Sequence, residues 1–188
     1  TNPCGEIILS PYDSCRLMVI NLFSFVVDPF TEAAFFDFEK YEEVVQKAQR
    51  LMDDMIDLEI EQVDKILVKI DSDPEPESVK AIERELWTKV KKRGLEGRRT
   101  GLGVTAVGDA LAGLGIQYGS ANSIEWVENF YKSLALNAYR SSCILAQERG
   151  AFPIHSHDRE KGHEFLERIW EEAPDVYDMS RRHGRRNI

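Results

Sequence analysis

The chain has 188 residues, 43% of them hydrophobic and 30% charged, a composition typical of one ordinary globular core. Its formal net charge of −9 argues against a general nucleic-acid-binding surface, so no direct contact with DNA is expected. No run approaches the ~18 uninterrupted apolar residues of a membrane-spanning helix, so no membrane contact is expected. Three cysteines in a chain without a visible signal peptide favour a cytoplasmic protein whose thiols are reactive or buried.

The first six residues, TNPCGE, place an amide, a thiol and a carboxylate at every second position. In an extended segment alternate side chains share a face at intervals of about 6 to 7 Å, so Asn2, Cys4 and Glu6 would contact one small polar molecule together. The intervening Pro3 and Gly5 suit a loop tip or a sheet edge better than a central strand. We therefore expect this segment to present its thiol and to carry the chemistry of the chain.

Residues 1–27 are interpreted as the only strand-like stretch. Short apolar runs at 6–9 and 17–23 are separated by a turn-rich spacer, which predicts two adjacent strands or extended segments. Because strands and helices do not alternate in the rest of the sequence, a self-contained parallel sheet is not expected. The early strands are predicted to pair with strands outside the chain.

A helical hairpin is predicted for residues 37–93. Apolar residues recur at helical spacing from 37 to 70, over about nine turns. A linker with two prolines follows at 71–77, and Ser78 is suited to cap a second helix. Gly94 is expected to end that helix.

Helices are also predicted for residues 98–188. The segment 98–115 consists of small and apolar residues, and its helical part is expected to pack closely against a neighbour. A long helix is predicted at 123–149, where a glycine follows directly. A last helix near 158–172 is expected to stop before Pro174.

Other chemistry-bearing residues are interpreted as structural. Cys143 lies on a predicted helix, is not part of a constellation of polar residues, and is expected to pack. The arginines near the C-terminus are expected to form a solvated charge run. The glycine pair in Gly101-Leu102-Gly103 lacks the third glycine of a dinucleotide-binding turn, so it is read as a packing device. Three histidines match no tight zinc spacing and predict a solvated start of a helix without a metal: His155, His157 and His163.

Cys4 and Cys15 lie eleven residues apart, and spacing alone leaves their role open. Both are small enough to be buried packing residues, as in a helical scaffold module. Alternatively, they would form a reversible disulfide in a thiol-disulfide redox module.

Several motifs carry a resemblance to a known family. The segments NPCGEI, DSCRL and INL, in that order within residues 2–22, are similar to the active-site segment of the large, catalytic subunit of ribonucleotide reductases. The stretches GRRTGLGV, LGIQYGS and ERGAFP extend the likeness in the same order, so the resemblance covers almost the whole chain. The first motifs look most like the adenosylcobalamin-dependent class, class II.

The resemblance implies an α/β fold. The chain would be a mostly helical fragment of the family's ten-stranded α/β barrel, with strand-like segments near its N-terminus. Residues 1–188 would belong to a single catalytic barrel domain, with the active-site loop and strands at 1–27, the hairpin at 37–93 and helices at 98–188. An internal fragment of this kind is expected to be inactive alone, because the phosphate-binding loop and an upstream cysteine would lie outside it.

The resemblance also implies roles for four residues. Cys4 matches the cysteine that becomes a thiyl radical and removes the 3′ hydrogen of the ribose. Glu6 matches the general base for the 3′ hydroxyl, and Asn2 the amide that binds the substrate hydroxyls. Cys15 matches one of two cysteines that reduce the 2′ position and become a disulfide. The implied cofactor is adenosylcobalamin, and the implied partners are a ribonucleotide substrate, the rest of the reductase chain, a thioredoxin-like reductant and a second copy in a homodimer.

Overall fold

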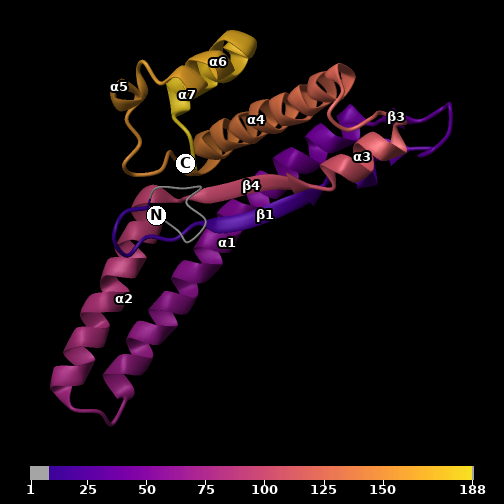
Figure 1. Cartoon of the computed structure of the whole chain (residues 1–188). Coiled ribbons are helices and arrows are strands. Elements are labelled where there is room, and N and C mark those ends of the chain that lie inside the picture. Colours follow the sequence, from indigo (N-terminus) through magenta and orange to yellow (C-terminus); the bar gives the residue numbers. More distant parts are fainter. Residues whose placement is uncertain (1–8, 188) are drawn as a thin grey trace.

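A computed structural model describes residues 9–187, in which long helices accompany two short sheets (Figure 1). The helices are α1 (Phe38–Ser72), α2 (Glu77–Gly97), α3 (Val107–Gly113), α4 (Ala121–Arg149), α5 (His157–Glu160), α6 (Glu164–Glu172) and α7 (Pro174–His183), and η1 (Leu22–Phe25) is a 3₁₀ turn. The strands are β1 (Arg16–Asn21), β2 (Val26–Val27), β3 (Phe35–Phe36) and β4 (Thr100–Thr105). No helix within this part of the chain is long and apolar enough to cross a membrane.

The strands β1 and β4 form a parallel pair. Their register runs from Arg16 beside Thr100 to Asn21 beside Thr105. Two predictions are therefore wrong: that residues 1–27 contain the only strands, and that residues 98–188 are helical throughout. β1 also finds its partner within the chain, contrary to the expectation. The strand β4 was not predicted because it is rich in glycine and other small residues. Glycine is depleted in strands except where another segment approaches closely.

The two faces of this parallel pair have different environments. Both strands pack against α1, and Ile20 on the α1 side of β1 is buried. On the opposite face, Leu17 and Val19 are 61% and 59% exposed. Because alternate strand residues point to opposite faces, residues 17, 19 and 21 share this open side with Gly101 and Gly103 of β4.

The predicted hairpin is present as α1 and α2, which lie side by side and project away from the sheet (Figure 1). Asp37 caps α1, and its carboxylate accepts a hydrogen bond from the backbone N–H of Lys40 at 2.9 Å. Gly94 does not end α2, contrary to the prediction, and the helix continues to Gly97. A side chain at Gly94 would lie 3.3 Å from Ile60 of α1, so this glycine permits close packing inside the hairpin.

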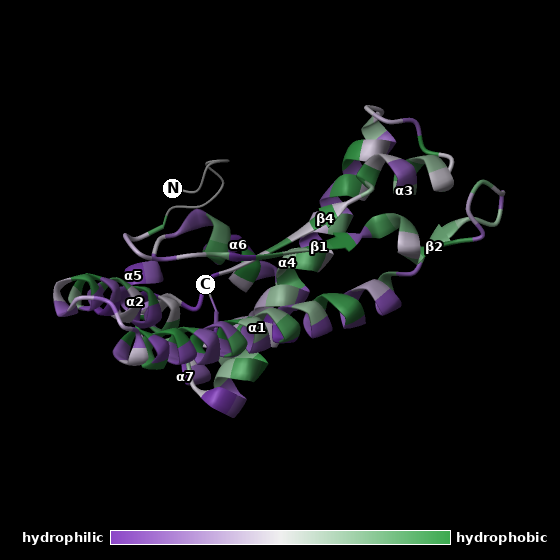
Figure 2. Cartoon of the chain, turned by 90° about the horizontal axis from the view of Figure 1, so that it is seen from below, coloured by the Kyte–Doolittle hydropathy of each residue, from purple (hydrophilic) through white to green (hydrophobic). Residues whose placement is uncertain are grey.

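The main hydrophobic core lies at the other end of α1, where it meets η1, β3 and α4. Its aromatic centre includes Phe25, Phe36, Tyr41 and Phe130, all buried. Burial raises the pKa of the Tyr41 hydroxyl, which donates a hydrogen bond to the carbonyl of Phe130 at 3.4 Å. Figure 2 shows hydrophobic residues along β1 and this end of α1, with frequent hydrophilic residues on the hairpin.

The last predicted helix is divided in the structure. Residues 157–172 form α5 and α6, and the break contains Gly162, which has a positive φ of 81°. Pro174 does not end the helical region but occupies the first turn of α7, where its missing N–H is not needed. The prediction missed α7, because a proline was read only as a stop. The helix α7 packs against α4.

A buried carboxylate connects four separate parts of the fold. Asp53 of α1 is fully buried, and its Oδ1 accepts hydrogen bonds from Arg98 Nη2 at 2.6 Å and Asn187 Nδ2 at 2.8 Å. Its Oδ2 accepts from Arg149 Nη1 at 2.9 Å and Arg186 Nε at 3.3 Å. Burial raises the pKa of this carboxyl, but the bonds from Arg98 and Asn187 and the nearby positive charges outweigh it, so the pKa lies below its ordinary value.

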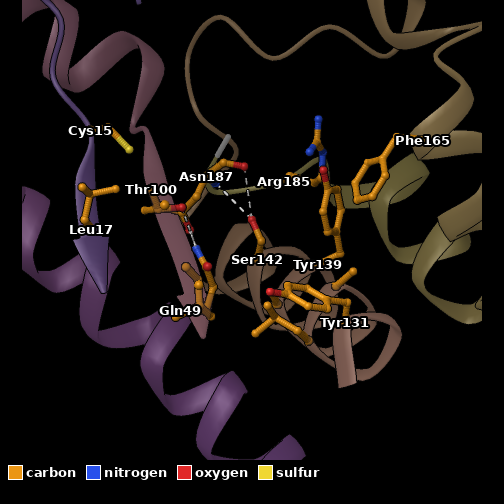
Figure 3. Close-up of a pocket in the computed structure, with 16 residues that line it drawn as sticks. Cys15, Leu17, Gln49, Thr100, Tyr131, Tyr139, Ser142, Phe165, Arg185 and Asn187 are labelled. Carbon is orange, nitrogen blue, oxygen red and sulfur yellow. Dashed lines mark hydrogen bonds between the residues drawn. The ribbon is translucent and has the colours of Figure 1, made fainter. Parts of the chain in front are cut away.

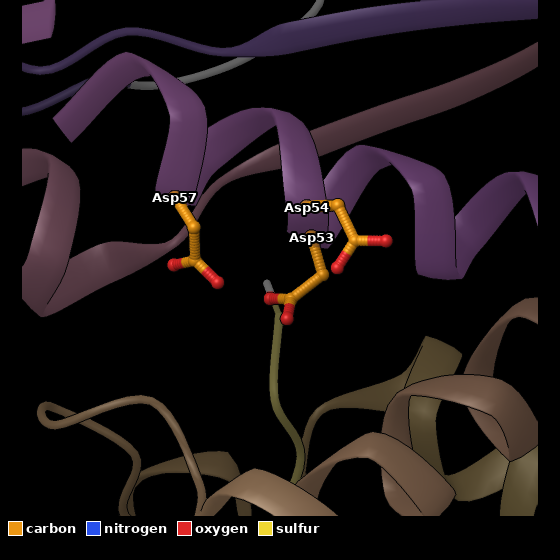
Figure 4. Close-up of side chains that lie close together, drawn as sticks. All are labelled: Asp53, Asp54 and Asp57. Atoms are coloured by element: carbon orange, nitrogen blue, oxygen red, sulfur yellow. The ribbon is translucent and has the colours of Figure 1, made fainter. Parts of the chain in front are cut away.

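Two further carboxylates lie beside Asp53 on α1 (Figure 4). One carboxylate oxygen of Asp54, one of Asp57 and one of Asp53 lie within 4.8 Å of one another. Arg98 Nη1 lies 2.8 Å from Asp57, and Arg149 Nη1 lies 2.6 Å from Asp54. The cluster is thus neutralised by guanidinium groups of the chain itself.

The C-terminal arginines do not form the solvated charge run that was predicted. Arg185 is buried, and the side chain of Arg186 is only 14% exposed because it reaches Asp53. Arg181 and Arg182 are exposed, as expected for the last turn of α7. The prediction failed for Arg185 and Arg186 because their carboxylate partners lie far away in the sequence.

Candidate functional site

The structure places one of the four predicted site residues. Asn2, Cys4 and Glu6 lie outside residues 9–187, so their predicted arrangement stays a prediction. Cys15 lies in the connection that immediately precedes β1 and is half-buried. The site is therefore described from Cys15 outward.

Cys15 lies against the start of β4. The space beside its sulfur is provided by Gly101, because a Cβ built on Gly101 would lie 3.2 Å from Cys15 Sγ and 2.5 Å from Leu17 Cδ2. The Cys15 thiol also points to the carbonyl oxygen of Arg16, at 3.8 Å. The predicted packing role is thus confirmed for Gly101, against which Leu17 and the candidate thiol pack, but not for Gly103, which has no described atom within 4 Å of its added Cβ.

A cavity of about 480 Å³ adjoins Cys15, and Figure 3 shows Cys15 and Leu17 on one side of it and Tyr139 and Phe165 on the other. This volume is in the usual range for small-molecule sites. The lining residues come from β1, β4, α1, α4, α6 and the C-terminal segment: Cys15, Leu17, Gln49, Thr100, Gly101, Leu102, Gly103, Tyr131, Leu134, Ala135, Ala138, Tyr139, Ser142, Phe165, Arg185 and Asn187.

A short hydrogen-bonded chain forms the polar wall of this cavity. Gln49 Nε2 donates to Thr100 Oγ1 at 3.2 Å and to Asn187 Oδ1 at 3.1 Å. The backbone N–H of Asn187 donates to Ser142 Oγ at 3.0 Å. These bonds hold the C-terminal segment beside the start of β4, close to Cys15 (Figure 3). Sequence patterns did not reveal this wall, because its members are isolated polar residues on four elements.

Arg185 closes the far side of the cavity. Its guanidinium carbon lies 5.1 Å from the centre of the Tyr139 ring, and its Nη2 pairs with Glu160. His155 Nε2 lies 3.6 Å from the other oxygen of Glu160, and the His155 side chain is 11% exposed. The predicted solvated position is therefore wrong for His155, which packs edge-on against Phe152.

Cys143 is a packing residue, as predicted. Its side chain is fully buried, and Ala173 and Val176 belong to the same hydrophobic cluster. Burial raises the pKa of the Cys143 thiol to about 11, so the thiol stays protonated and unreactive at neutral pH. This residue provides a matched control for experiments on Cys15.

The close contact at Gly101 leads to a testable prediction. Gly101→Ala is expected to reduce the free energy of unfolding by about 1 kcal/mol, because Cys15 and Leu17 must move away from the added methyl group. Gly103→Ala is the control, since no described atom lies within 4 Å of its added Cβ. Urea unfolding of both variants measures the difference, and an equal or larger loss for Gly103→Ala would contradict the described packing.

Comparisons with known proteins agree with the motifs and the fold. The family described as "Ribonucleotide reductase, barrel domain" matches residues 1–187. The chain is 33% identical, over 159 residues, to a vitamin B12-dependent ribonucleoside-diphosphate reductase of Mycobacterium tuberculosis, which covers 85% of the chain and 19% of the relative. The protein of that name in Thermoplasma acidophilum is 35% identical over 153 residues, which are 81% of the chain and 16% of the relative.

More distant relatives include the alpha subunit of a ribonucleoside-diphosphate reductase. The subunit from Chlamydia pneumoniae is 29% identical over 160 residues, which are 83% of the chain and 12% of the relative. The chain thus spans less than a fifth of the length of these curated relatives. Because the family match extends over residues 1–187, the chain belongs to the ribonucleotide reductase barrel-domain family.

Proposed function

We propose that this chain is a section of the catalytic barrel of an enzyme that reduces ribonucleotides to deoxyribonucleotides. The observation that carries the proposal is the 33–35% identity, over more than 80% of the chain, to proteins named vitamin B12-dependent ribonucleoside-diphosphate reductases. The half-buried Cys15 beside a cavity of ligand size is consistent with it. A thiol in that setting has both restricted access to solvent and room for a substrate nearby.

The proposed chemistry begins at the N-terminal motif. Cys4, as a thiyl radical, takes the 3′ hydrogen of the ribose and returns it to the 3′ carbon after the 2′ position has been reduced, which regenerates the thiyl radical. Glu6 accepts the proton of the 3′ hydroxyl, which requires hydrogen-bond distance to that group and exclusion of water. Asn2 binds the substrate hydroxyls through its amide.

Cys15 is proposed to supply reducing equivalents at the 2′ carbon. It acts with a second cysteine from another part of the protein, and each thiol gives one electron and one proton. The 2′ hydroxyl leaves as water, a C–H bond replaces the C–O bond, and the two sulfurs form a disulfide. A thioredoxin-like protein then reduces that disulfide by thiol exchange. Cys4 and Cys15 would therefore not pair with each other in the catalytic cycle.

Adenosylcobalamin is the proposed cofactor, by likeness to the vitamin B12-dependent relatives. It supplies the one-electron chemistry that starts such a reaction. The cavity beside Cys15, at about 480 Å³, has the size of a site for a much smaller molecule, so the cofactor is not proposed to bind there. We therefore propose that other parts of the protein bind the cofactor. No step of its chemistry is assigned to residues 9–187.

The remaining partners follow from the same proposal. The substrate is a ribonucleoside diphosphate or triphosphate, and the rest of the reductase chain completes the site. The assembled enzyme is proposed to be a cytoplasmic homodimer that contacts neither DNA nor a membrane. The chain alone is expected to be inactive, since part of the site lies outside it.

The test is product formation by the assembled enzyme that contains this chain. We expect conversion of ribonucleotide to deoxyribonucleotide only when adenosylcobalamin and a dithiol reductant are both present, measured by chromatography of the nucleosides. Activity without cobalamin would contradict the proposed class. No product under any of these conditions, or product from the isolated chain, would contradict the proposed function.

A further inference from the structure

The segment that carries Cys15 is held on both sides by ion pairs. On one side, Arg99 Nε lies 2.6 Å from Asp13 Oδ2, and the two side chains are 16% and 3% exposed. On the other side, Arg16 Nε lies 2.6 Å from Glu59 Oε2 of α1, and the two side chains are 5% and 35% exposed. Cys15 therefore lies between two anchored positions.

The Asp13–Arg99 pair is supported by backbone bonds around the same residues. Asp13 Oδ1 accepts a hydrogen bond from the N–H of Ser14 at 2.9 Å. The N–H of Arg16 donates to the carbonyl of Arg99 at 3.4 Å. The carboxylate and the backbone of this segment are thus both attached to the residue that precedes β4.

Arg99 also lies next to the place where Cys15 meets β4. It directly precedes Thr100, the first residue of β4, and Gly101 provides the space for the Cys15 sulfur. A shift of the Asp13–Arg99 pair would therefore move the thiol relative to the strand it packs on and to the cavity it lines. The side chain of Arg16 points the other way, because its ion pair with Glu59 joins the segment to α1.

We propose that Asp13 and Arg99 form a positioning pair that holds the Cys15 thiol against β4 at the edge of the cavity. This inference depends on the proposed role of Cys15 as a reductant. Neither Asp13 nor Arg99 is proposed to touch the substrate. Their contribution is geometric: a displacement of about 1 Å at a reacting group can slow a reaction by about 10²-fold. A nearly solvent-free ion pair suits this purpose because its energy depends strongly on geometry.

Steady-state kinetics of the assembled enzyme test the pair. Asp13→Asn is expected to lower kcat by about 10²-fold while KM for the ribonucleotide stays unchanged. The double variant Asp13→Asn/Arg99→Gln is expected to lose no more activity than the less active of the two single variants. Each single variant already removes the Asp13–Arg99 interaction, so the second substitution has nothing further to break. Arg93→Gln is the control: it breaks the more exposed Arg93–Glu96 pair on α2 and is expected to leave kcat unchanged.

A second measurement reports on the thiol without any turnover. The rate of alkylation of Cys15 by iodoacetamide, followed by peptide mass spectrometry, is expected to rise by roughly threefold or more in Asp13→Asn, because the released segment opens to solvent more often. If Asp13→Asn does not fold, Arg99→Lys serves in its place, since it keeps the charge but loses the planar guanidinium. Asp13→Glu, which keeps the carboxylate, is expected to restore part of kcat.

The outcomes separate this inference from the proposed function. Unchanged kcat and unchanged alkylation in both Asp13→Asn and Arg99→Lys would overturn the positioning role. A lower kcat with a raised KM and unchanged alkylation would also overturn it, because the pair would then act on the nucleotide. If the unaltered enzyme forms no deoxyribonucleotide but alkylation of Cys15 still responds to Asp13→Asn, the positioning pair stands and the proposed function fails.

Discussion

Asp53→Ala is expected to reduce the free energy of unfolding by about 3–5 kcal/mol, the usual cost of removing one partner from a buried ion pair. Arg98 is the partner most affected, because its side chain is only 3% exposed and would be left without its buried carboxylate. Arg98 also adopts a left-handed backbone conformation, with a φ of 43°, which is uncommon for residues other than glycine. The Asp53 contact is therefore expected to help keep Arg98 in this conformation at the end of α2.

Asp57→Ala is the matched control for Asp53→Ala. Asp57 is on the same helix and contacts the same arginine, but its side chain is 47% exposed. Its removal is expected to cost less than about 1 kcal/mol, as is typical of exposed pairs. Chemical denaturation of both variants at neutral pH measures the difference. Equal losses for the two variants would contradict the central role of Asp53.

The pH dependence of stability provides a second test of Asp53. Because its pKa is lowered in the folded state, the carboxylate contributes stability that is fully present above the unfolded-state pKa of about 3.9. This contribution is lost as the pH falls through the lower, folded-state pKa. The unaltered chain is therefore expected to lose stability below about pH 4 more steeply than Asp53→Ala. Parallel curves for the two proteins would show that Asp53 does not titrate as described.

Cys4→Ser is expected to have the largest effect on function. A serine hydroxyl gives up its hydrogen atom far less readily than a thiol, so the proposed radical would not form. Deoxyribonucleotide production by the assembled enzyme is expected to fall by about 10⁴-fold or more, the scale of loss when a group that performs the chemistry is removed. Binding of the nucleotide is expected to remain, because the substitution is small.

Cys143→Ala is the control for this experiment. Cys143 is fully buried and belongs to a hydrophobic cluster, so its replacement is expected to cost stability but to leave the rate of product formation unchanged. The rates of all variants are compared at a temperature at which each is folded. Retained activity in Cys4→Ser would contradict the radical role, and loss of activity in folded Cys143→Ala would show that the cysteines had been assigned to the wrong roles.

Much of the fold was predictable from local patterns. The helical spacing from residue 37 to 70 and the glycine after Arg149 correctly indicated α1 and the end of α4, because these signals depend on neighbours within one or two turns. β4 was missed, since its glycines are explained only by β1, which is distant in the sequence. The packing of α7 against α4 was also missed, because no local pattern records a contact between distant segments.

The candidate site was predictable in part. The DSCRL motif identified Cys15, and the structure places this residue beside a cavity. The sequence did not indicate that Asp13 pairs with Arg99, because 86 positions separate them. Arg185 was wrongly predicted to be solvated for the same reason, since its partner Glu160 is also distant in the sequence. Ion pairs between distant segments are decided by the tertiary fold, so charge patterns along the chain do not reveal them.

The most direct test of the account is to map disulfides in the assembled enzyme after a single turnover without an external reductant. We expect one new disulfide per deoxyribonucleotide formed, joining Cys15 to a cysteine outside this chain, while Cys143 remains a thiol. A disulfide between Cys4 and Cys15, or product formation with Cys15 still reduced, would contradict the proposed role of Cys15.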